Sequence, residues 1–103
     1  MVNLVYTHSA RNDLKSIFLY ISNDSPLNAK RFIFILKERI KTLKNTPEKG
    51  RPLFPEKFPT IRQVLFRSYR IVYVFKNNEV AIIAISHQSR LLSNIEELKP
   101  YII

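Results

Sequence analysis

The sequence predicts an α+β fold, in which a hairpin of two helices packs on one face of a small, twisted and mainly antiparallel sheet. Two observations predict this class. Apolar residues recur with helical spacing up to about residue 45, whereas β-branched and aromatic runs dominate residues 61–86. The expected order is β-α-α-β-β-β with a short C-terminal tail. The 103 residues are expected to form one domain, 1–103.

The first helix follows a short strand that we expect over residues 3–7, where Leu, Val and Tyr favour extended backbone. Ser9 is placed to cap the N-terminus of this helix, and Asp13 to interact favourably with the helix dipole. The apolar positions follow the i, i+3, i+4, i+7 pattern of an amphipathic helix: Leu14, Ile17, Phe18 and Ile21.

A second helix is expected from Pro26 to about Asn45. Ser25 is its predicted N-cap, and Pro26 suits the first helical position. Its predicted buried residues are Ala29, Phe32, Ile33, Leu36, Ile40 and Leu43. The break between the helices is so short that they should pack as an antiparallel hairpin.

Three strands are expected in the second half of the chain, over residues 61–67, 69–76 and 79–86. Asn77 and Asn78 predict a tight turn between the last two strands. The last strand is apolar on both faces, so it should be central in the sheet rather than an edge. We expect an extended loop over residues 46–60, and a short helix in the tail capped by Ser93.

The composition excludes several classes of function. Seventeen Lys and Arg against eight Asp and Glu give a net charge of +9, which predicts an acidic partner. The chain contains no Cys, one Gly and two His, so we expect no cofactor and no metal site. The longest apolar runs fall far short of the ~20 residues of a membrane span, and the first residues do not resemble a signal peptide. We therefore expect a cytoplasmic protein without a membrane partner.

Basic residues accompany the predicted sheet. Arg62, Arg67 and Arg70 lie in or between the first two strands of the second half, and His87 and Arg90 follow the last strand. Guanidinium groups bind phosphate bidentately, and imidazole transfers protons near neutral pH. The set therefore permits metal-independent cleavage of RNA. A solvated basic face and a hydrogen-bonded structural histidine are the alternative interpretation.

The segment 61–73, with its Tyr-Arg-Ile-Val-Tyr centre, resembles the strand pair of the RelE/ParE superfamily of bacterial type II toxins. The strand end Ile-Ile-Ala-Ile-Ser-His-Gln-Ser-Arg and the Ala-Arg-Asn-Asp-Leu opening agree with it. The resemblance runs from Val5 to Arg90 and implies the same β-α-α-β-β-β fold. It also implies a toxin that arrests growth, silenced in a hetero-oligomer by a cognate acidic antitoxin.

Two branches of the superfamily imply different targets. RelE-like members resemble ribosome-dependent mRNA endonucleases, and for them the resemblance implies catalytic roles for Arg62, Arg70, Arg90 and, less directly matched, His87. Val64 departs from that branch, because a second basic residue is expected there. ParE-like members resemble DNA gyrase poisons and lack this catalytic set. The His-Gln-Ser-Arg ending and the Pro-Glu-Lys-Gly-Arg-Pro loop favour ParE, so whether the protein is an enzyme stays open.

The antitoxin is expected on the helical hairpin. Phe18 and Leu19 lie beside the main apolar stripe of the first helix, and Phe34 and Ile35 beside that of the second. Exposed apolar ridges of this kind accept a partner helix. Burial of the same residues against the sheet is the alternative. A third hypothesis is a non-toxic binding module that retains only the antitoxin groove.

Overall fold

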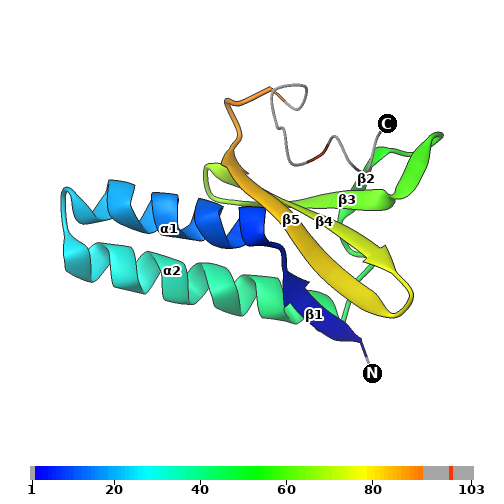
Figure 1. The fold of residues 1–103 in the computed structure, drawn as a ribbon, viewed down its shortest axis with the longest axis horizontal. Coiled ribbons are helices and arrows are strands. Elements are labelled where there is room, and N and C mark those ends of the chain that lie inside the picture. The colour runs from blue at the N-terminus through cyan, green and yellow to red at the C-terminus, as the bar shows by residue number, and fades with distance from the viewer. Residues whose placement is uncertain (1, 92–97, 99–103) are drawn as a thin grey trace.

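Two helices cover one face of a five-stranded sheet (Figure 1), which confirms the predicted α+β class. The structure, a computed structural model, describes residues 2–91 and residue 98. The elements are β1 (Asn3–Tyr6), α1 (His8–Ser22), α2 (Pro26–Lys41), the 3-10 turn η1 (Thr42–Lys44), β2 (Arg51–Phe54), β3 (Phe58–Phe66), β4 (Tyr69–Lys76) and β5 (Glu79–His87). The predicted short helix capped by Ser93 lies outside the described residues.

The strand order is β1-β5-β4-β3-β2, so β5 has a partner on both sides. The prediction that the last strand is not an edge is therefore confirmed. β1 pairs with β5 in parallel, and the other neighbouring strands are antiparallel. The turn between β4 and β5 holds Asn77 and Asn78 at φ of 52° and 59°, which Asn tolerates better than most residues.

The sequence analysis missed β2, which falls within the stretch expected to be a loop. Its residues pair with β3 through Arg51 opposite Gln63 and Pro52 opposite Arg62. Proline argued against a strand because it lacks an N–H group. β2 is an edge strand, however, and one side of its backbone needs no partner, so proline is tolerated there.

Helix α1 begins earlier than predicted, and Thr7 rather than Ser9 is its N-cap. The Thr7 hydroxyl oxygen accepts a hydrogen bond from the Ala10 N–H at 3.1 Å. The same hydroxyl lies 3.0 Å from the Ile82 carbonyl, to which it donates. Ser9 lies inside the helix. The sequence alone did not reveal that β5 would supply a partner for Thr7.

The expectation that Asp13 serves the helix dipole was also wrong, since it lies beyond the first turn of α1. Its carboxylate accepts a hydrogen bond from the Ile85 N–H at 2.8 Å. β1 pairs with β5 only as far as Ile82, so the backbone of β5 beyond that point needs another partner. Thr7 and Asp13 provide it, and they join the start of α1 to the interior of the sheet.

Helix α2 confirms its predicted start. The Ser25 hydroxyl accepts from the Asn28 N–H at 3.2 Å, and Pro26 is the first helical residue. The α-helix ends at Lys41 and continues as η1, slightly before the expected end at Asn45. No helix within residues 2–91 is both long and apolar enough to cross a membrane.

Apolar side chains form one cluster on each face of the sheet. The helix-side core joins α1 and α2 to Ile71, Tyr73 and Ile82 of the strands. The outer cluster, on the opposite face, contains Ile61, Val72, Val74, Ile83, Ala84 and Leu98. Side chains alternate along the strands except at a bulge in β5, where the consecutive residues Ile83 and Ala84 both join the outer cluster.

Candidate functional site

Arg70 lies on the outer face, since it is separated by one residue from Val72 of the outer cluster. It is half-buried and stands opposite Ser86 of β5. Its Nη2 donates to the Gln88 carbonyl at 3.0 Å. Its Nε and the Ser86 Oγ are both buried, and neither has a hydrogen-bond partner within the described part of the chain. The guanidinium is therefore fixed at one edge and still has an unused donor.

Gln88 fixes this end of the sheet. Its backbone N–H donates to the Ser68 carbonyl at 2.8 Å, and its side-chain amide donates to the Arg67 carbonyl at 2.7 Å. Both bonds reach the turn between β3 and β4. The segment that follows β5 is thus attached to that turn, and Arg70 is placed between them.

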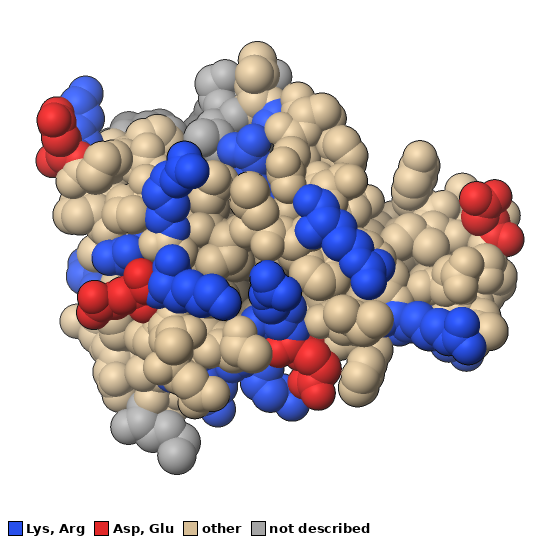
Figure 2. All heavy atoms as spheres, turned by 180° about the vertical axis from the view of Figure 1, so that it is seen from behind, with Lys and Arg blue, Asp and Glu red and all other residues tan. Residues whose placement is uncertain are grey.

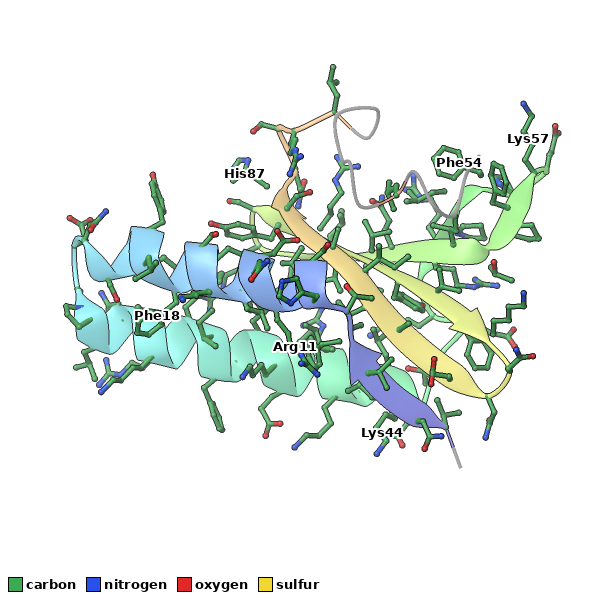
Figure 3. All side chains as sticks on the ribbon, in the orientation of Figure 1. Arg11, Phe18, Lys44, Phe54, Lys57 and His87 are labelled. Carbon is green, nitrogen blue, oxygen red and sulfur yellow. The ribbon has the colours of Figure 1, made fainter. Side chains whose placement is uncertain are left out.

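His87 stands at the end of β5, opposite Tyr69 (Figure 3). It is exposed, and its Nδ1 accepts from the Ser89 N–H at 3.1 Å with the Ser89 hydroxyl at 2.8 Å. An accepting Nδ1 places the proton of the neutral ring on Nε2. The ring meets Tyr69 edge-on, with centroids 5.6 Å apart. Burial raises the pKa of Tyr69 above its ordinary value, and the charge of Tyr20 adds to that effect.

Arg62 occupies a different place. It pairs with Tyr73 across β3 and β4, and so lies on the helix side of the sheet. Its Nη1 donates to the Gly50 carbonyl at 2.8 Å and to the Glu48 carbonyl at 3.1 Å. The guanidinium therefore holds the loop that enters β2.

The structure thus brings three of the four predicted catalytic residues to one end of the sheet, but His87 is on the helix side with its partner Tyr69, whereas Arg70 is on the outer face. Arg90 joins Arg70 and His87 there through a bond from its N–H to the His87 carbonyl at 3.0 Å. Arg62 lies on the opposite face from Arg70. Its partner on β4 is Tyr73, three residues further along that strand than Arg70. No group of three His, Asp or Glu side chains suited to hold a metal occurs among the described residues.

The apolar residues predicted to bind a partner are largely exposed. Leu19, Phe34 and Ile35 are 55%, 65% and 42% exposed, whereas Phe18 is half-buried. The sequence analysis missed Tyr20 and Leu27, which are also exposed. Leu27 lies seven residues before Phe34, so the two share one side of α2, and this spacing could have revealed it.

Phe34 forms the wall of an apolar groove between α2 and β1. Leu4 and Tyr6 of β1 form the other wall, Lys37, Glu38 and Lys41 form the rim, and the volume is about 350 Å³. Burial raises the pKa of Tyr6, in agreement with its position against the core. Figure 3 shows Phe18 on the helical hairpin, well separated from His87 at the end of β5.

Basic side chains dominate the charged surface. On the face seen from behind in Figure 2, Lys and Arg side chains outnumber Asp and Glu and cross the middle of the molecule. Lys41 and Glu38, at 3.2 Å, form an exposed ion pair on α2. Pairs of this kind contribute little to stability.

A basic α+β fold with exposed apolar residues on its helical hairpin agrees with the RelE/ParE superfamily of type II toxins that the sequence resembles. The chain belongs to the family described as ParE toxin of type II toxin-antitoxin system, parDE, whose model matches residues 4–92. An antitoxin is therefore its partner.

Known proteins agree with this assignment. Toxin RelE2 of Caulobacter vibrioides is 36% identical over 92 residues, which cover 88% of this chain and 100% of the relative. A chain of the chromosomal ParDE toxin-antitoxin system from P. aeruginosa has a TM-score of 0.70 at 26% identity, covering 84% of this chain and 96% of that one. A copper-bound mutant toxin from Helicobacter pylori shares the fold at a TM-score of 0.57 and 22% identity, covering 89% and 100%.

Proposed function

We propose that this toxin arrests growth by poisoning DNA gyrase. The placement of Arg62 carries the proposal. The resemblance assigns Arg62 and Arg70 to one catalytic set in a RelE-like nuclease, but the Arg62 guanidinium is bonded to the Gly50 and Glu48 carbonyls on the other face of the sheet. The match to the ParE family adds support, since the ParE branch implies gyrase as the target.

Ribosome-dependent mRNA cleavage is the second candidate, and the gathering of Arg70, His87 and Arg90 at one end of the sheet favours it. Arg70 has a buried Nε without a partner among the described residues, and that donor could meet a phosphate oxygen. His87 would act as a general acid in its imidazolium form, giving up the proton of Nε2, since Nδ1 is engaged by Ser89. A non-toxic binding module is the third candidate.

Gyrase supercoiling of relaxed plasmid tests the first two candidates. Purified toxin should inhibit supercoiling and trap cleaved DNA, and the antitoxin should reverse both effects. Arg70→Ala should leave this inhibition unchanged. If folded wild-type toxin arrests growth without affecting gyrase, the proposal is wrong, and mRNA cleavage abolished by Arg70→Ala would support the second candidate. A chain that does not arrest growth when expressed alone would be the binding module.

We further propose that the groove between α2 and β1 binds an acidic, amphipathic segment of the antitoxin. Phe34 is 65% exposed beside Leu4 and Tyr6, and Lys37 and Lys41 at the rim complement acidic side chains. The other residues predicted to contact the antitoxin are Leu19 and Ile35, which are exposed on the hairpin, and Phe18, which is half-buried.

Phe34→Asp should therefore weaken antitoxin binding at least tenfold. It places a carboxylate in an apolar groove, where that carboxylate would also repel the acidic residues of the bound antitoxin. Leu91→Asp is the matched control, since Leu91 is equally exposed but lies beyond β5. Calorimetry of both variants with the antitoxin measures the difference. Equal affinities for the two variants, or association that does not depend on salt, would argue against this surface.

A further inference from the structure

Three cations outside the surfaces described above form a continuous line on the molecule, which we call the cationic stripe: Arg67, Arg39 and Lys49. Arg67 and Arg39 contact the same aromatic ring, with their guanidinium carbons 5.1 and 5.9 Å from the centroid of Phe66. Arg39 and Lys49 line one groove of about 190 Å³ between the end of α2 and β3. Arg39 thus links the other two.

The charges of the stripe are not neutralised within the protein. Across residues 2–91 and 98, no carboxylate lies within ion-pair distance of Arg39, Lys49 or Arg67. A π-face holds a guanidinium in place without cancelling its charge. Arg67 is held by a second ring as well, 5.4 Å from the centroid of Phe32. The two arginines are therefore oriented before any ligand arrives.

The backbone at Arg67 gives an independent sign that this side chain is needed. Its φ is 53°, in the left-handed region where Gly or Asn costs less than Arg. The Gln88 amide, which donates to the Arg67 carbonyl at 2.7 Å, holds this strained turn. The two-residue turn between β3 and β4 requires φ > 0 at this position, and Arg occupies it in place of the Gly or Asn that would cost less.

We propose that the cationic stripe binds the phosphate backbone of duplex DNA. The aromatic rings of the stripe are covered, since Phe66 is buried and Phe32 half-buried under Arg67. They offer no platform on which an unpaired base could stack, so contacts to phosphate, and not base stacking, would provide the affinity. The inference rests on the proposed function for its setting, because gyrase acts on duplex DNA.

Fluorescence anisotropy with purified toxin and a short, labelled duplex over a series of KCl concentrations tests this proposal without gyrase. The logarithm of the association constant should fall linearly with the logarithm of the salt concentration. The Arg39→Gln/Arg67→Gln variant should bind more weakly, with a slope smaller by about 1.8, or ~0.9 for each phosphate that it leaves without a cation. The corresponding Lys variant, which keeps both charges, should recover most of the slope.

Lys57→Gln/Lys76→Gln is the matched control, since it removes the same charge from exposed positions at the β2–β3 turn and the end of β4 (Figure 3 labels Lys57). Its slope should stay close to that of the wild type. Equal losses in the two Gln variants would overturn the proposal, because net charge alone would then explain binding. Binding of the wild-type toxin to poly-glutamate but not to the duplex would also overturn the proposal. Gyrase inhibition by a toxin that does not bind DNA would refute this inference alone. A toxin that binds DNA without inhibiting gyrase would refute only the proposed function.

Discussion

The Tyr73 hydroxyl joins the sheet to the loop before β2, and its removal should destabilise the protein measurably. It donates to the Pro47 carbonyl at 2.7 Å and accepts from the buried Gly50 N–H at 2.9 Å. Tyr73→Phe leaves that N–H unsatisfied, at a cost of about 1–3 kcal/mol, while water can reach the partly buried carbonyl at a smaller cost. The total loss should be about 2–3 kcal/mol, which lowers the melting temperature by roughly 10 °C.

Chemical denaturation monitored by circular dichroism measures this loss, and Tyr69→Phe is the control. The Tyr69 hydroxyl makes no hydrogen bond within the described residues, so its removal should cost less than about 0.5 kcal/mol. Gly50→Ala tests the same contact from the other side, since its Cβ would lie 2.5 Å from the Tyr73 Oη. In the Tyr73→Phe background this substitution should cost less, because the nearest atom is gone. Equal losses from Tyr73→Phe and Tyr69→Phe would refute the reasoning.

Three further predictions concern stability. Asp13→Ala should cost about 1–3 kcal/mol in urea unfolding, because it removes the acceptor of the Ile85 N–H; a change below about 0.5 kcal/mol would contradict this. Ser25→Ala should cost about 1 kcal/mol through loss of the α2 N-cap, and Ser25→Gly only a few tenths, which thermal melts can compare. Burial raises the pKa of Tyr73 above its ordinary value near 10, against the lowering effects of Gly50 and Arg62. The unfolded state thus ionises first, so the free energy of unfolding should be insensitive to Tyr73 at neutral pH and fall above about pH 10, less steeply in Tyr73→Phe.

Local sequence signals predicted the elements whose partners are close in the chain. Ser25 and Pro26 mark the start of α2 with chemistry that acts within one turn, and the Asn77–Asn78 turn needs only its own backbone preference. Signals that depend on distant partners were misread. Thr7 caps α1 partly because it also reaches Ile82, and Pro52 lies in a strand because that strand is at an edge.

The candidate site shows the same limit. The sequence placed Arg62 and Arg70 on neighbouring strands, and this is correct, but the face that each occupies depends on the register of β3 against β4. Leu19 and Phe34 were identified from their positions beside the helical stripe. The contribution of Leu4 and Tyr6 to the same groove requires the parallel pairing of β1 with β5, which no local pattern encodes.

That parallel pairing has a consequence for the order in which the protein is made. β5 lies inside the sheet, yet it is synthesised after all the other strands, and β1 has no other strand to pair with. A nascent chain that lacks β5 holds the helical hairpin and the β2–β4 strands without the strand that joins them to β1 and Thr7. Contacts between such distant residues form slowly. The groove between α2 and β1 therefore cannot be complete until β5 has been made and has paired with β1.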